Sequence, residues 1–181
     1  MSQLPAPNET AYPFTLTDIT GTTQTFERET DGSPTLLFFF KHDCATCELT
    51  APLVQHIHDE FSVNGLRVIG ISQDTAEDTA TFISENDLTF TVTLDTELDC
   101  SVDYGFDAVP ALVLANLNHK VLASFEGFSK SDLNNLVALA ATQCDRIAPT
   151  LDSLLTTLPE ERPGCGSRIH DPDIARRLAV K

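Results

Sequence analysis

A run of five apolar residues, Leu36–Phe40, is followed within four residues by an amphipathic stretch that begins at Cys44. Five residues is the length of a strand, and a segment that is apolar on both faces is typical of a central strand in a covered sheet. Residues 44–61 carry apolar side chains at helical spacing. This junction of strand and helix predicts an α/β fold.

The rest of the first 145 residues repeats the alternation. Strands are expected at 14–18, 22–26, 66–72, 111–115 and 121–125, and helices at 74–86 and 131–142, the last one capped by Ser131. The first two strands form an N-terminal hairpin. The expected architecture is therefore α/β, with a central mixed β-sheet and helices on both of its faces.

The character of the chain changes after residue 145. Short helices are expected at 151–158 and from Asp171-Pro172, with Pro159, Pro163 and Gly164 interrupting the pattern between them. We therefore divide the chain into a domain at residues 1–145 and a C-terminal extension at residues 146–181, partly helical and partly irregular, that carries Cys165.

Charge excludes some classes of partner. The 181 residues include 27 acidic and 11 basic side chains, a net charge of −16. Such a surface repels nucleic acids and anionic lipids, so we expect neither a nucleic-acid nor a membrane partner. No apolar run reaches the roughly 20 residues that span a bilayer, and the N-terminus lacks the features of a signal peptide. The expected location is cytoplasmic.

The pair Cys44-Ala-Thr-Cys47 stands where the predicted strand gives way to the predicted helix. Free amides at a helix N-terminus stabilise an anion, including a thiolate, so Cys44 is the candidate nucleophile. Cys47, one turn later, is close enough to close a disulfide. A single C-x-x-C is also half of a zinc site, but no second C-x-x-C is present. Redox chemistry is favoured over a structural metal.

Here the sequence resembles the thioredoxin superfamily, in particular the redoxin branch of thiol-disulfide oxidoreductases and thiol-specific antioxidant proteins. The resemblance covers about residues 10–140. It rests on the strand before the motif, the C-x-x-C itself, a proline in the following helix, a Val-Pro pair before a late strand, and two further segments: Leu36–Phe40, Cys44, Cys47, Pro52, Val109-Pro110, 88–95 and 104–110.

The resemblance implies a thioredoxin-like fold and a role for each of these residues. Cys44 would attack and Cys47 resolve, while Pro110 would follow a cis peptide bond and, with Val109, shape the substrate groove. It implies a protein or small-molecule disulfide or dithiol as substrate, and a separate electron donor. No cofactor or metal is required, and the expected setting is cell redox homeostasis or antioxidant defence.

Two alternatives remain beside this function. The peroxidases of the fold carry a P-x-x-x-T-x-x-C pattern, but Leu37 and Lys41 stand at its Pro and Thr positions relative to Cys44. A peroxiredoxin-like hydroperoxide reductase is therefore the less favoured enzyme. The alternative of another class is a module that binds a soft metal through the two thiolates.

Next to the motif, His42 and Asp43 are candidates for electrostatic tuning. A cationic His42 would stabilise the Cys44 thiolate, whereas Asp43 would oppose it. Cys100 follows an acidic loop and is expected to be a buried, inert thiol. Cys165 is expected to be exposed and flexible between two glycines, with nearby arginines favouring its thiolate. One hypothesis is that Cys165 pairs with Cys144, or exchanges with Cys44 and Cys47, as a second redox centre. The alternatives are a metal or cluster ligand in the extension and an incidental thiol.

Overall fold

The computed structural model describes residues 3–27 and 32–178, so the ends of the predicted arm and extension, and the linker at 28–31, lie outside the described residues. Seven of the described strands form one sheet in the order β2-β1-β5-β4-β3-β7-β8. Their bounds are β1 (Phe14–Asp18), β2 (Thr23–Phe26), β3 (Thr35–Phe40), β4 (Arg67–Ser72), β5 (Thr91–Leu94), β7 (Ala111–Ala115) and β8 (Val121–Glu126).

Strand β3 lies inside the sheet, and every one of its residues is buried. It runs parallel to β4 and antiparallel to β7, while β4 is parallel to β5. The two N-terminal strands, β1 and β2, form the expected antiparallel hairpin. The apolar run in the sequence thus becomes the centre of the predicted mixed sheet.

Helices cover both faces of this sheet, as predicted. Phe40 stacks on Phe82 of α2 with ring centroids 4.5 Å apart, whereas Phe39 packs on Tyr104 of α3 at 4.8 Å. Successive side chains of a strand point to opposite faces, so α2 and α3 cover opposite sides. The helices are α1 (Ala45–Phe61), η1 (Ser62–Asn64), α2 (Ala76–Glu85), α3 (Asp99–Tyr104), α4 (Lys130–Gln143), α5 (Asp152–Leu155), η2 (Arg168–His170) and α6 (Pro172–Leu178).

The predicted start of one helix is wrong. Helix α4 begins at Lys130 and is capped by Ser129, not Ser131. Ser129 has extended backbone, and its hydroxyl accepts the N–H of Asp132, so the change from strand to helix occurs there. Within the described residues, no helix has the length and apolar character needed to cross a bilayer.

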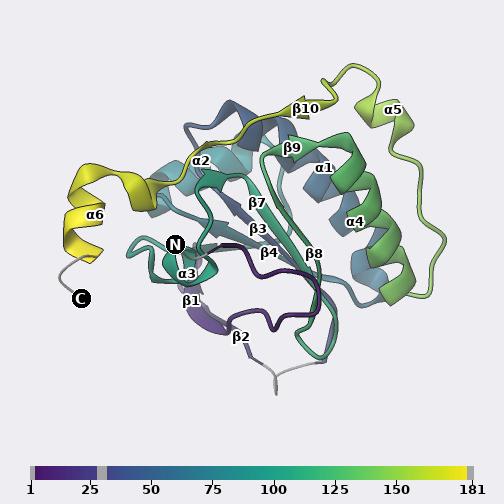
Figure 1. The fold of residues 1–181 in the computed structure, drawn as a ribbon, viewed down its shortest axis with the longest axis horizontal. Coiled ribbons are helices and arrows are strands. Elements are labelled where there is room, and N and C mark those ends of the chain that lie inside the picture. Colours follow the sequence, from purple (N-terminus) through teal and green to yellow (C-terminus); the bar gives the residue numbers. More distant parts are fainter. Residues whose placement is uncertain (1–2, 28–31, 179–181) are drawn as a thin grey trace.

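Four short strands connect the C-terminal extension to the rest of the chain: β6 (Ala108–Val109), β9 (Phe128–Ser129), β10 (Glu161–Arg162) and β11 (Cys165–Gly166). Strand β10 pairs with β9, and β11 pairs with β6, both antiparallel. Figure 1 shows the extension running from α5 past β9 and α2 to α6, across the top of the molecule. The domain boundary at residue 145 stays a prediction, and part of the extension adds strands to the earlier region.

Candidate active site

The C-x-x-C motif lies at the N-terminus of α1. Cys44 is the N-cap of this helix, and its Sγ accepts the backbone N–H of Cys47 at 3.2 Å. The first amides of a helix have no partner within the helix and carry partial positive charge. Both cysteines are free thiols without exposed surface. The helix terminus thus provides a binding site for a negative charge on Cys44.

The two thiols differ in acidity. The pKa of Cys44 is lowered to about 6, mainly by a hydrogen bond from the Cys47 side chain, with burial acting in the opposite direction. Further hydrogen bonds from Cys165 and from backbone N–H groups lower it as well. Burial raises the pKa of Cys47 well above its usual value, and the neighbouring Cys44 raises it further. Near neutral pH, Cys44 is therefore largely a thiolate and Cys47 a thiol.

A second segment of chain reaches Cys44 from the sheet. The peptide bond between Val109 and Pro110 is cis, as the resemblance implied. When Cys44 is protonated, its thiol donates to the carbonyl oxygen of Val109 at 3.4 Å. Val109 is fully buried. The helix terminus and the residues before Pro110 therefore meet at the same sulfur atom.

Cys165 completes the cluster from the C-terminal extension. Strand β11 places it directly opposite Val109, and the thiols of Cys165 and Cys44 interact closely enough to shift the pKa of each other. The expectation of an exposed, flexible thiol with a stabilised thiolate is wrong. Cys165 is half-buried in a strand, and burial and the hydrogen bond to Cys44 raise its pKa. The expected arginine effect is missing because Arg168 is bound to carboxylates instead.

Comparison with known proteins agrees with this geometry. The model of the AhpC/TSA family matches residues 7–124, which include the C-x-x-C helix and the cis proline. The chain belongs to the AhpC/TSA family. The predicted membership of the redoxin branch is thereby confirmed, and with it the predicted class of enzyme, a thioredoxin-like oxidoreductase.

One sequence relative of this AhpC/TSA chain agrees with that class, and solved structures share its fold. It is 26% identical to the thiol-disulfide oxidoreductase ResA of Halalkalibacterium halodurans over 121 residues, which are 66% of this chain and 68% of that protein. The fold matches a putative thiol:disulfide interchange protein DsbE from Chlorobium tepidum with a TM-score of 0.70 and 24% identity, covering 77% of this chain and 99% of the other. Peroxidoxin BcpB from Mycobacterium tuberculosis matches with a TM-score of 0.64 and 18% identity, over 78% and 97% of the two chains. The predicted thioredoxin-like fold is confirmed.

Two further cysteines of the AhpC/TSA chain lie apart from this cluster. Cys100 is buried in α3, as expected, and burial followed by the charge of Asp95 raises its pKa well above the usual value. Cys144 caps the C-terminus of α4, where burial raises its pKa and the backbone of Leu66 lowers it. The contacts of Cys165 are with Cys44 and Val109. They favour the second of its two expected roles, exchange with the C-x-x-C pair.

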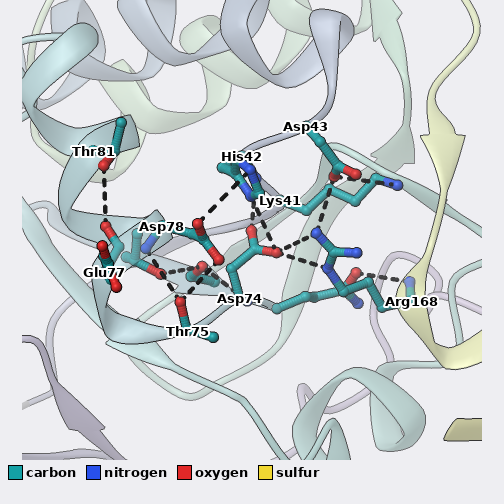
Figure 2. A network of polar contacts seen from close by, with 12 residues as sticks. Lys41, His42, Asp43, Asp74, Thr75, Glu77, Asp78, Thr81 and Arg168 are labelled. Carbon is teal, nitrogen blue, oxygen red and sulfur yellow. Dashed lines mark hydrogen bonds and ion pairs between the residues drawn. The ribbon is translucent and has the colours of Figure 1, made fainter.

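His42 lies beside the carboxylate of Asp74, and Asp43 faces the guanidinium of Arg168 (Figure 2). The backbone N–H of His42 donates to Asp74 Oδ2 at 2.6 Å, and its ring Nδ1 lies 3.5 Å from Asp74 Oδ1. Asp43 Oδ1 accepts from Arg168 Nη2 at 3.0 Å. Electrostatic tuning of Cys44 by His42 and Asp43 stays a prediction. Their contacts place them in a cluster of charged side chains with Asp74 and Arg168.

Four residues around the thiols were not identified from the sequence: Thr46, Gln73, Asp74 and Arg168. All four contact the segment that carries Cys165 or belong to it. One signal was present, because Arg168 stands three residues after Cys165, but its carboxylate partners lie more than 90 positions earlier. Asp74 directly precedes Thr75, the N-cap of α2, and no pattern in the sequence distinguishes it from an ordinary residue at the start of a helix.

Metal binding has one candidate group among the described residues. His42, Asp43 and Asp74 each offer a ligand atom, and these atoms lie within 4.8 Å of one another. The group contains no cysteine, and the guanidinium of Arg168 already bonds to both of its carboxylates. This arrangement does not favour the soft-metal alternative, which needs thiolate ligands.

Proposed function

We propose that the protein is a thiol-disulfide oxidoreductase in which Cys44 is the nucleophile and Cys47 the resolving thiol. The observation that carries this proposal is the position of Cys44 at a helix N-cap, with its Sγ 3.4 Å from the carbonyl oxygen of Val109 and its pKa lowered to about 6. A thiolate is the reactive form in disulfide exchange. The raised pKa of Cys47 supports the order in which Cys44 attacks first and Cys47 second.

The reaction has two exchange steps. The Cys44 thiolate attacks one sulfur of a substrate disulfide, that disulfide breaks, and the released substrate thiolate takes a proton. Cys47 then loses its proton and attacks the sulfur of Cys44, which releases the second substrate thiol and leaves a Cys44–Cys47 disulfide. A separate dithiol donor must reduce this disulfide for the next cycle. Run in reverse, the same steps oxidise a dithiol substrate.

Val109 and Pro110 belong to the proposed substrate groove. The carbonyl of Val109 lies within hydrogen-bonding distance of Cys44 Sγ, and a strand already pairs with Ala108 and Val109. Backbone groups at such an edge bind an extended peptide by adding a strand. A protein or peptide disulfide therefore suits the groove. We retain the cytoplasmic location expected from the sequence as part of this proposal.

Cys165 extends the same chemistry within the chain. In the oxidised enzyme, the Cys165 thiol loses its proton and attacks Cys44, the Cys44–Cys47 bond breaks, and Cys47 takes up the proton. The step changes no net oxidation state. Its support is the position of Cys165 opposite Val109, whose carbonyl oxygen lies 3.4 Å from Cys44 Sγ, together with the interaction of the two thiols that shifts the pKa of each.

A glutathione redox titration with peptide-resolved alkylation of all five cysteines tests the function. We expect Cys44 and Cys47 to titrate together as one two-electron couple, and a Cys47→Ser variant to accumulate disulfide-linked Cys44. Absence of a common transition contradicts the proposal. Turnover of hydrogen peroxide, measured separately, is expected to be absent, and peroxide consumption lost in Cys44→Ser would favour the hydroperoxide reductase.

A further inference from the structure

Residues 161–168, here called the strap, cross the thiol cluster as an added strand. Cys165 pairs with Val109 and Gly166 with Ala108, and the N–H of Ser167 donates to the carbonyl of Asp107 at 2.9 Å. Figure 1 shows the strap running from β10 toward α6. The strap therefore pairs with the residues just before the cis proline, as an extended peptide ligand would.

The strap closes the proposed site. Cys44 and Cys47 have no exposed surface. The hydroxyl of Thr46, between them, donates to the carbonyl of Pro163 at 2.9 Å. An external disulfide must touch the sulfur of Cys44 in order to react. The strap and an external substrate therefore exclude each other at this edge.

The residue before Cys165 fits the groove only because it lacks a side chain. A Cβ placed on Gly164 would lie 2.7 Å from the carbonyl oxygen of Val109 and 2.9 Å from Cβ of Ala108. A Cβ on Gly166, by contrast, would meet nothing within 4 Å. The groove thus accepts only glycine at the position before the cysteine, whereas it leaves room for a side chain at the position after it.

The carboxylates of Asp43 and Asp74 bind Arg168, the cationic residue at the end of the strap (Figure 2). Arg168 Nε donates to Asp74 Oδ1 at 2.7 Å, and Nη2 donates to Asp43 Oδ1 at 3.0 Å. The side chain of Asp74 is only 1% exposed. A buried carboxylate is costly without charged or donating partners. This pair of carboxylates is therefore built for a positive group three positions after the cysteine.

Gln73 binds both a backbone and a side-chain group of the same stretch. Its Oε1 accepts the N–H of Arg168 at 3.0 Å, and its Nε2 donates to the hydroxyl of Ser167 at 2.9 Å. Gln73 is buried. Its polar atoms lose these partners when the strap leaves, and a peptide of similar shape restores them.

Charge favours the same kind of ligand. Residues 1–145 carry 22 of the 27 acidic side chains, while six of the 11 basic ones lie in residues 146–181. The strap therefore comes from the less acidic part of the chain and docks on the acidic part. Complementary charge of this kind speeds association and selects partners.

We propose that the strap is an internal copy of the substrate. This inference rests on the exchange chemistry proposed above. The site takes an extended peptide disulfide whose reactive cysteine follows a glycine and precedes, by three positions, a cationic residue. Asp74 and Asp43 form the subsite for that cation, and the strap competes with the substrate for the groove.

The first experiment measures specificity. Two peptides, Gly-Cys-Gly-Ser-Arg and Gly-Cys-Gly-Ser-Glu, each carry a thionitrobenzoate group on the cysteine as a chromophoric mixed disulfide. We expect the reduced enzyme to react about tenfold faster with the arginine peptide, a ratio typical of one charge-assisted contact. Asp74→Asn keeps an oxygen for the His42 N–H and is expected to remove the preference.

The second experiment displaces the strap with a matched pair of variants. Gly164→Ala is expected to raise the alkylation rate of Cys44 and the reaction rate with both peptides severalfold. Gly166→Ala adds the same methyl group in open space and is expected to match the wild type. Arg168→Ala weakens the strap by a separate contact and covers the case in which Gly164→Ala does not fold.

The outcomes separate this inference from the function on which it rests. Equal rates for the two peptides, in enzymes that react with both, overturn the cation subsite. Unchanged Cys44 alkylation in Gly164→Ala and Arg168→Ala overturns the competition by the strap. If Cys44 reacts with neither peptide in any variant and shares no redox transition with Cys47, the proposed function itself fails.

Discussion

Cys47 and Cys165 both contact Cys44, but they reach it by opposite routes. Cys47 lies in the first turn of α1, so the geometry of one helix fixes its distance from Cys44. Cys165 comes from the other end of the chain and is held by pairing with Val109 and by the contacts of the strap. The first contact lasts as long as the helix, whereas the second is a docking contact that can open.

The two regions also differ in what stabilises them. Helix α1 buries eight residues against the core, most of them apolar. Within the strap only Ser167 is buried, and its other residues are exposed or half-buried. Segments with little buried apolar surface open locally at a small fraction of the global unfolding free energy. The strap can therefore leave the groove while the domain stays folded.

The largest effect is expected from replacing the thiols of the cluster. Cys44→Ser should abolish exchange, because no other described thiol has a lowered pKa. In Cys47→Ser, an oxidised substrate should leave a Cys44–Cys165 disulfide, detected by mass spectrometry of peptides from unreduced protein. In the Cys47→Ser, Cys165→Ser double variant, the substrate itself should stay linked to Cys44. A stable substrate adduct in the single variant would show that Cys165 does not act.

The next effect concerns Asp95, which is linked to the strap through Ser101 and Gln73. Burial raises the pKa of Asp95 to about 6 from 3.8, although its carboxylate accepts hydrogen bonds from Ser101. The folded state then binds the proton of Asp95 more tightly than the unfolded state does. The contribution of Asp95 to the free energy of unfolding is therefore fully present below about pH 4 and is lost as the pH rises through about 6. The loss is about 3 kcal/mol at 1.36 kcal/mol per pKa unit.

Asp95→Asn should remove this dependence. Urea unfolding of both proteins between pH 4 and 7 provides the test. We expect the stability of the wild type relative to the variant to fall across this range, and strap opening to be affected little. A constant difference would contradict the raised pKa. A parallel rise in the alkylation rate of Cys44 would show that Asp95 and the strap are coupled through Gln73, which bonds to both Ser101 and Ser167.

A smaller effect should appear in hydrogen exchange of the strap. Arg168→Ala removes two charge-assisted hydrogen bonds and is expected to speed exchange at residues 161–168 about tenfold, while α1 is unchanged. Arg168→Lys keeps the charge, so its exchange rate in the strap should lie between those of the wild type and Arg168→Ala. Exchange that rises equally in α1 and the strap would mean that the two regions do not open independently.

The smallest effect is a shift in the acidity of Cys44. Because a hydrogen bond from Cys165 contributes to its low pKa, Cys165→Ala should raise that pKa toward the usual value. Cys165→Ser retains a donor and should raise it less. The ultraviolet absorbance of the thiolate, followed against pH, measures both. An unchanged titration in Cys165→Ala would show that the Cys165 side chain does not contribute to the low pKa of Cys44.

Much of this arrangement could be predicted from the sequence where the determinants are local. The apolar run Leu36–Phe40 and the helical spacing after Cys44 gave the central strand and its helix, because each pattern lies within one element. The family resemblance located the Val109–Pro110 bond. Strand β5 was not predicted as a strand, since Thr91–Leu94 is short and alternates threonine with apolar residues.

The strap could not be predicted in this way. Its position depends on Asp74 and Asp43, which lie 94 and 125 positions from Arg168, and no local pattern encodes such a pairing. The sequence around Cys165 even suggested the wrong behaviour. Its glycines indicated flexibility, whereas Gly164 allows close contact with the carbonyl of Val109. Its arginines suggested help for a thiolate, but Arg168 neutralises carboxylates.

The covalent connection of the strap to the domain has a quantitative consequence for any partner. A ligand tethered by a short flexible linker has an effective concentration on the order of millimolar at its own binding site. Free peptides that bind no better than the strap would need comparable concentrations to enter. The chain would therefore react little with sparse or weakly matching disulfides and mainly with the few that bind more tightly than its own C-terminal extension.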